Sequence, residues 1–201
     1  MDLENVRVLV TIPDAALVPP PSLFAHQSTL HGQAHVARVM VHAFRLVEAT
    51  GFTEEMPRLW AAAYLHDIAR THDGTCHRHG ADAWARLATL PDVRALFRRA
   101  GVKDDDYPAI EAAVTVHSQG EPPPDHPHRR LMALLKDADG LDRVRLGDLD
   151  PRYFRHAQTA GMVDFAGRLY ETTDGRIEPG PDYWSRLWPH VARILALRPS
   201  A

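Results

Sequence analysis

The chain has 201 residues, of which 45% are hydrophobic and 24% charged. This length and composition are typical of one globular domain with its own core and exclude a disordered or collagen-like chain. The formal net charge is −3 at pH 7, so no overall basic field would attract polymeric DNA or RNA, and we expect no such partner.

The first residues differ in pattern from the rest of the chain. Residues 5–12, "VRVLVTIP", could form a short strand or an extended arm, and "VPPP" at 18–21 favours a polyproline-like backbone. We therefore expect residues 1–25 to form a short extended N-terminal arm. Residues 26–201 would then form a single helical domain.

The remaining pattern is helical throughout. Apolar residues recur at spacings of three and four from Val36 to Val47, which predicts a helix over about 30–49 with Gly51 after its end. Thr53 is a suitable N-cap for a second helix that ends near His66. Almost no segment shows strand-like alternation, so we expect an all-α fold. Further helices are predicted over 79–90, 91–101, 104–118 and 126–144, with two or three more in 151–170 and 181–197.

Two adjacent residues at the end of the second helix, His66 and Asp67, suggest a metal site. An imidazole and a carboxylate together suit Mn, Co, Ni, Mg, Zn or Fe, and a bound ion lowers the pKa of its water. Two ligands cannot form a tight site, so others must come from elsewhere. In the first helix, His31 and His35 are four residues apart and share a face, and Arg38 could meet a phosphate oxygen.

A later segment, "LLKDADGLDRV", also places carboxylates after an apolar run. Together with "HGQAHVARV" and "AAAYLHDIAR", in that order, it resembles the HD-domain superfamily of metal-dependent phosphohydrolases over residues 31–145. The resemblance implies an all-helical fold and one divalent metal ion. Its ligands would be His35, His66, Asp67 and Asp139. We expect Asp137 and Asp142 to be solvated or to support these ligands.

Some members of that superfamily hold a second metal ion with two further histidines. Here these would be His79 and His117, although His77 competes with His79. Asp67 or His117 would be the catalytic residue that orients the attacking water or accepts its proton. The substrate phosphate would be bound by side chains on three segments: His31, Arg38, Lys136 and Arg143.

The resemblance implies a reaction type and leaves the substrate open. Members that hydrolyse stringent-response alarmones carry a Glu-Asp pair shortly after the doublet, where this chain has Ala69 and Arg70. The Gly-Tyr-Pro signature of cyclic-di-GMP phosphodiesterases is also absent. We therefore expect hydrolysis of a small phosphorylated metabolite, with nucleotides first among the candidates. The alternatives are an HD-fold di-iron oxygenase and a non-catalytic nucleotide-binding HD module.

The expected compartment is the cytoplasm. The only cysteine, Cys76, cannot form an intramolecular disulfide, which favours a reducing environment. The first residues lack the basic and apolar regions of a signal peptide, and no apolar run approaches about 18 residues. We therefore expect no membrane partner.

Overall fold

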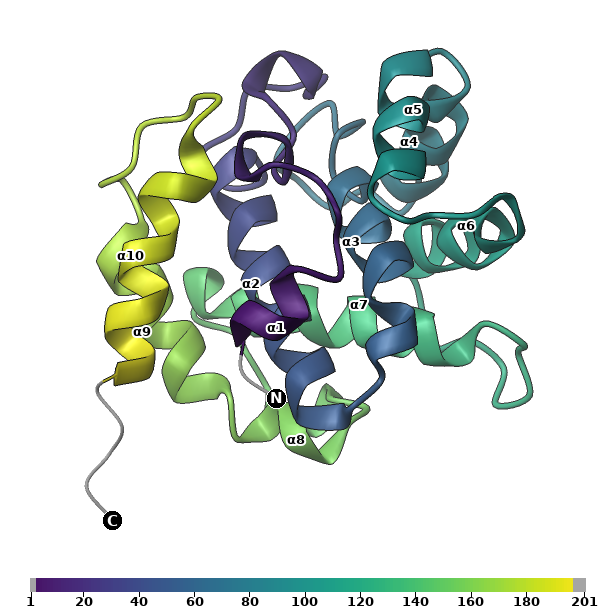
Figure 1. Ribbon diagram of the computed structural model, residues 1–201. Coiled ribbons are helices and arrows are strands. Elements are labelled where there is room, and N and C mark those ends of the chain that lie inside the picture. Colours follow the sequence, from purple (N-terminus) through teal and green to yellow (C-terminus); the bar gives the residue numbers. More distant parts are fainter. Residues whose placement is uncertain (1–2, 197–201) are drawn as a thin grey trace.

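The computed structural model describes residues 3–196, and they confirm the all-α expectation because they contain helices and no strand. Four helices form the centre (Figure 1): α2 (Gln33–Thr50), α3 (Met56–Leu65), α6 (Tyr107–Val116) and α7 (Arg129–Leu141). Helix α2 packs against α3 and α7, and α6 packs against the same two helices. These helices enclose one continuous hydrophobic core.

The other helices surround this centre. Helix α4 packs against α6, and α9 packs against α10. Short 3-10 helices join several of them. Besides the four central helices, the α-helices are α1 (Leu3–Arg7), α4 (His79–Leu87), α5 (Pro91–Arg99), α8 (Ala157–Ala160), α9 (Val163–Thr173) and α10 (Tyr183–Ala196).

Helix α2 ends where the sequence predicts. Gly51 follows it with φ 75°, a left-handed conformation that glycine adopts without a steric penalty, and its N–H bonds to the Val47 carbonyl at 2.8 Å. Most side chains of α2 are buried, because other helices cover it on several sides. The helix therefore fixes His35 deep in the domain.

The N-terminal residues differ from the extended arm expected for residues 1–25. Residues 3–7 form helix α1, which crosses in front of α2 (Figure 1). Val6, Val10 and Leu17 are at most 1% exposed and belong to the same core as the central helices. The Trp60 indole N–H also donates to the Leu17 carbonyl at 2.9 Å. Residues 3–24 therefore pack as part of the domain, because their apolar side chains are buried there.

The two or three further helices expected over 151–170 and 181–197 are α8, α9 and α10, and the segment between α7 and α8 is irregular. It contains two 3-10 helices, η5 (Asp142–Leu146) and η6 (Pro151–Tyr153), before the short α8. The buried Asp137 carboxylate accepts the backbone N–H groups of Arg155 and His156 at about 3 Å. A side chain that binds these groups competes with helical hydrogen bonding. These hydrogen bonds hold residues 155 and 156 in a non-helical bend before α8.

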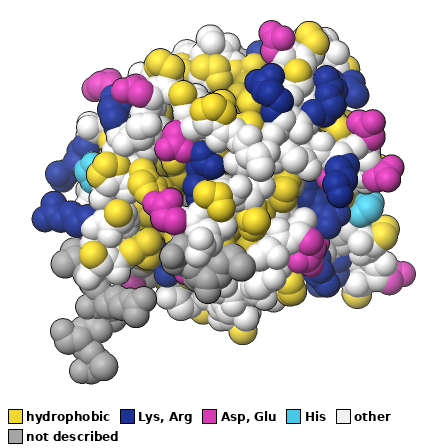
Figure 2. Space-filling view, viewed as in Figure 1, with side chains coloured by type: hydrophobic (Ala, Val, Ile, Leu, Met, Phe, Trp, Pro, Cys, Tyr) yellow, Lys and Arg dark blue, Asp and Glu magenta, His cyan; other side chains and the backbone are white. Residues whose placement is uncertain are grey.

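Charged side chains of both signs are interspersed with hydrophobic ones on the face shown in Figure 2. Neither positive nor negative charge dominates that face. Within residues 3–196, every helix is too short or too polar to cross a lipid bilayer.

Candidate metal centre

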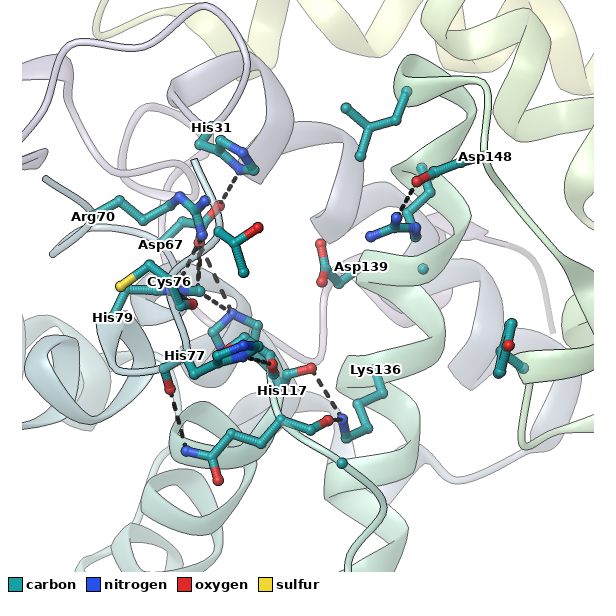
Figure 3. Close-up of a pocket in the computed structure, with 18 of the residues that line it drawn as sticks. His31, Asp67, Arg70, Cys76, His77, His79, His117, Lys136, Asp139 and Asp148 are labelled. Atoms are coloured by element: carbon teal, nitrogen blue, oxygen red, sulfur yellow. Dashed lines mark hydrogen bonds and ion pairs between the residues drawn. The ribbon is translucent and has the colours of Figure 1, made fainter. Parts of the chain in front are cut away.

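A cavity of about 720 Å³ opens beside the ends of the central helices. The loop between α3 and α4 lines one side of it, and α7 with the following segment lines another. Figure 3 shows Asp67 on the first side and Asp139, from α7, on the second. The residues closest to these two carboxylates are histidines from four segments of the chain.

The first group of potential ligands contains His35, His66 and Asp139. They come from α2, from the residue after α3 and from α7. The Nε2 atom of His35 lies 3.1 Å from Nε2 of His66 and 3.3 Å from Oδ1 of Asp139. Both histidines are fully buried, whereas the Asp139 side chain is 27% exposed and reaches the cavity.

The second group contains Asp67, His79 and His117. The Nε2 atom of His79, the first residue of α4, lies 3.0 Å from Oδ1 of Asp67 and 2.8 Å from Nε2 of His117. His117 directly follows α6. His77, the other candidate for this position, is exposed and its ring contacts the Ser118 carbonyl instead.

Asp67 lies between these two groups and forms a third group of potential ligands with His31 and His35. Its Oδ2 atom is 3.4 Å from Nε2 of His35 and 3.1 Å from Nδ1 of His31, while its Oδ1 atom faces His79. Its side chain is only 3% exposed. One carboxylate therefore presents one oxygen to each group, which is the geometry of a bridging ligand.

The hydrogen bonds of the imidazoles determine which ring nitrogens point at the carboxylates. In His66, His79 and His117, Nδ1 lies 2.6–2.7 Å from the carbonyl oxygen three residues earlier. A carbonyl only accepts, so Nδ1 carries the proton and donates it, and Nε2 keeps a lone pair. In His35, Nδ1 bonds to the Asp142 carboxylate at 2.7 Å, so Nε2 is the nitrogen that faces the other ligands.

Four Nε2 atoms thus converge with two carboxylates, and once His35 is neutral each offers a lone pair. Such acceptors repel one another unless positive charge lies between them. Ligand atoms about 2.1 Å from one ion lie roughly 3.0–3.4 Å apart in octahedral or tetrahedral geometry. The Nε2 and carboxylate distances from His35, at 3.1–3.4 Å, fall in this range. These buried clusters could hold a metal ion, and their mixed N and O donors suit first-row transition metals.

The pKa values differ sharply within the cluster. Burial lowers the pKa of His117 to about 3 and also lowers that of His66, which favours the neutral rings that bind metals. Burial opposes protonation of His35 too, but its hydrogen bonds to three carboxylates raise its pKa to about 9. Burial opposes ionisation of Asp67, yet the surrounding histidines hold its pKa well below the ordinary value.

A close contact between α4 and α6 brings His79 to His117. A Cβ atom at Gly80 would lie 2.1 Å from the Val114 carbonyl oxygen and 3.1 Å from Nδ1 of His117. Real Cβ atoms essentially never approach so closely. Only glycine at this position allows the two helices to pack at this separation.

The position of Arg38 corrects an expectation from the sequence. Its guanidinium is buried and donates to both oxygens of Asp142, at 2.6 Å from Nε and 3.1 Å from Nη2. It does not line the cavity, so it is not placed to bind a substrate phosphate. Asp142, expected to be solvated or to support the ligands, is fully buried and does support His35.

The other predicted substrate-binding residues do line the cavity, namely His31, Lys136 and Arg143. Lys136 donates its ammonium protons to the carbonyls of His117 and Gln119 at 3.0 and 2.7 Å. Arg143 forms an ion pair with Asp148 on the half-exposed rim. Both side chains therefore have protein partners at the edge of the cavity.

Sequence reasoning missed two arginines beside the cluster. Arg70 lies against His79, and Arg145 lies against His31 and Asp142; both line the cavity with side chains less than 10% exposed. The Nε atom of each is buried and has no hydrogen-bond partner among the described residues. The sequence signal was present for Arg70, three residues after the doublet. Helix α3 ends at Leu65, before the doublet, so helical spacing did not predict the direction of the Arg70 side chain.

Comparisons of the chain with protein-family models, with curated proteins and with solved structures found no match.

Proposed function

We propose that this protein is a metal-dependent phosphohydrolase of the HD type that acts on a small phosphorylated metabolite, with nucleotides as the first candidates. The observation that carries the proposal is the convergence of four imidazole Nε2 atoms on the carboxylates of Asp67 and Asp139. His35, His66, Asp67 and Asp139 would hold one divalent ion. His79 and His117, with Asp67, would hold a second.

The charge of the cavity supports an anionic substrate. Six carboxylates and five cationic side chains line it, so a single bound divalent ion would make its formal charge positive. Positive charge in a partly enclosed cavity attracts anions and holds them near the reacting groups. The cationic residues are Arg70, Lys136, Arg143, Arg145 and Arg155.

The reaction would join a water oxygen to phosphorus and break the bond between phosphorus and the leaving oxygen, which takes up a proton. A bound divalent ion lowers the pKa of water and polarises phosphoryl oxygens. Asp67 would orient the attacking water, because its two oxygens face both ligand groups. Arg70 and Arg145 would donate hydrogen bonds to the phosphoryl oxygens, since both guanidinium side chains line the cavity beside the ligand groups.

His31 would exchange a proton with the leaving group. It lines the cavity and lies beside Asp67 without belonging to the four residues proposed for the first ion. His117, the other candidate for this role from the sequence, directs its Nε2 toward Nε2 of His79. It is therefore better suited to metal binding than to proton transfer.

The deciding experiment measures phosphate release from a panel of nucleotides and phosphomonoesters. Metal-stripped protein would be reloaded separately with Mn, Co, Ni, Mg, Zn and Fe. We expect metal-dependent release that Asp67→Ala abolishes and Asp73→Asn retains, because Asp73 lines the same cavity outside the ligand groups. Circular dichroism would verify that both variants fold.

Two outcomes would replace the proposal with another function. No release with any metal, combined with binding of two irons and reductant-dependent oxygen consumption, would indicate an oxygenase that uses the same histidines and aspartates. Nucleotide binding without release, without metal binding and without oxygen consumption would indicate a non-catalytic module.

A further inference from the structure

Large apolar side chains are rarely exposed in the described part of this protein. Only three are, namely Val8, Leu146 and Tyr153, with exposed fractions of 62%, 39% and 73%. Single exposed apolar residues are common and need no explanation. However, two of these three line the same cavity as the candidate metal centre.

Leu146 and Tyr153 both belong to the segment that follows α7. Leu146 ends η5 and Tyr153 ends η6, and the next residue, Phe154, also lines the cavity. We call Leu146, Tyr153 and Phe154 the apolar lip. Its residues come from one short stretch, so their common position results from the path of this segment.

The apolar lip is continuous with the candidate metal centre through Gly140. A Cβ atom at Gly140 would lie 3.4 Å from Cε1 of Phe154, so this ring packs over the glycine. Gly140 is next to Asp139 in α7, and both residues line the cavity. A substrate whose phosphoryl group binds at the metal centre beside Asp139 would therefore extend past Gly140 toward the aromatic rings.

We infer that the apolar lip binds a planar ring of the substrate, so that the substrate is a phosphorylated molecule with an aromatic group. This inference rests on the proposed function. Tyr153 is the specificity-determining residue, because its ring is the most exposed of the three and can stack on a flat group. Leu146 and Phe154 supply further apolar surface in the same cavity.

Phosphonates test the inference because they carry the anion without a hydrolysable ester bond. The probes are phenylalkyl phosphonates with one to four methylene groups, compared with methylphosphonate. Their binding to full-length protein is measured by calorimetry, with Mn²⁺ and separately with Zn²⁺. We expect one linker length to bind about tenfold more tightly than methylphosphonate, because only that length places the ring on the lip.

Three variants identify the source of this preference. Tyr153→Ala should reduce it about fivefold, whereas Tyr153→Phe should retain it because the ring face remains. Val8→Ala is the matched control, since it removes an exposed apolar side chain outside the cavity and should change nothing. Thermal unfolding would show that the Tyr153 variants, changed at an exposed position, remain folded.

The possible failures are distinguishable. Equal binding of all phosphonates, or an unchanged preference in Tyr153→Ala, would overturn the inference and leave the proposed function standing. An unchanged preference together with loss of self-association in Tyr153→Ala, measured by sedimentation, would assign the lip to a contact between copies. Binding of no phosphonate would overturn both the inference and the proposed function.

Discussion

The Asp142 carboxylate fixes the orientation of the His35 ring. Its Oδ2 atom lies 2.7 Å from Nδ1 of His35, and both side chains are fully buried. The Nε–H group of Arg38 donates to the other oxygen of the same carboxylate, Oδ1, at 2.6 Å. The Nε2 atom of His35 therefore points toward Asp67 and Asp139 because a buried ion pair holds the other side of the ring.

Replacing Asp142 with Asn should destabilise the fold strongly. The change leaves the buried Arg38 guanidinium with only the more distant, partly exposed Asp174 as a charged partner, at 3.8 Å. Breaking a buried pair costs about 3–5 kcal/mol. Urea denaturation would measure the loss in the free energy of unfolding. Asp148→Asn is the control: the Arg143–Asp148 pair is about half exposed, so its loss should cost less than about 1 kcal/mol. Equal effects of the two substitutions would contradict this account.

Binding of a divalent metal ion should raise the melting temperature. An ion at about 100 times its dissociation constant adds about 2.7 kcal/mol, which for a domain of this size corresponds to roughly 5–10 °C. Asp67→Asn should lose most of this shift, because Asp67 contributes an oxygen to each ligand group. Asp73→Asn should keep it. Differential scanning calorimetry with and without chelator decides, and a full shift in Asp67→Asn would refute the ligand assignment.

Metal uptake should release a proton from His35. The ring is protonated in the metal-free protein at neutral pH, because its hydrogen bonds to carboxylates outweigh burial and raise its pKa to about 9. A metal ligand must be neutral, so metal affinity should rise about tenfold per pH unit up to about pH 9. Calorimetry at pH 7.5 in two buffers with different ionisation enthalpies should detect about one released proton. No dependence on the buffer would contradict the assignment of His35.

His42 should make the protein sensitive to acid. Burial lowers its pKa to about 3, and neither ring nitrogen has a hydrogen-bond partner among the described residues. The unfolded chain binds this proton near pH 6.5, so the stabilising effect is complete above pH 6.5 and is lost as the pH falls toward 3. His42→Leu should flatten the pH dependence of urea unfolding by a few kcal/mol over this range. The exposed control His72→Gln should leave the slope unchanged.

Gly80→Ala should separate α4 from α6. The new Cβ would lie 2.1 Å from a backbone oxygen, and such overpacking typically costs about 1–3 kcal/mol. The shift would also move His79 away from His117 and weaken metal binding at the second group. Gly167→Ala, in α9, is the matched control because its Cβ would meet no atom within 4 Å apart from its chain neighbours and the backbone of its own helix, so stability should stay equal or rise slightly. A stable Gly80→Ala with unchanged metal binding would show that the helix contact adapts.

The helical architecture was predictable because apolar spacing and end signals agree along most of the chain. Gly51 after α2 and Pro91 at the start of α5 are clear local signals, and the structure has both helix ends there. The N-terminal segment was not predictable, since "VRVLV" fits a strand as well as a short helix. Only the core that covers Val6 decides between them.

The ligand groups were predictable from residue order, but the polar contacts around them were not. Arg38 lies one turn after His35, so helical spacing correctly places it on the same side of α2. Spacing cannot show that Asp142, more than 100 residues later, would occupy its guanidinium. Arg145 was missed for a similar reason. The chain changes from α7 to the 3-10 helix η5 just before it, which changes the direction in which its side chain points.

The two oxygens of Asp67 face different groups of histidines, and this makes the two groups interdependent. A cation on one side withdraws charge from the same carboxylate that would bind a cation on the other side, and the two cations also repel each other. The second ion should therefore bind more weakly than the first, so that filling of the sites shows negative cooperativity. When about one equivalent of metal has bound, molecules with a single ion should predominate over those with none or two.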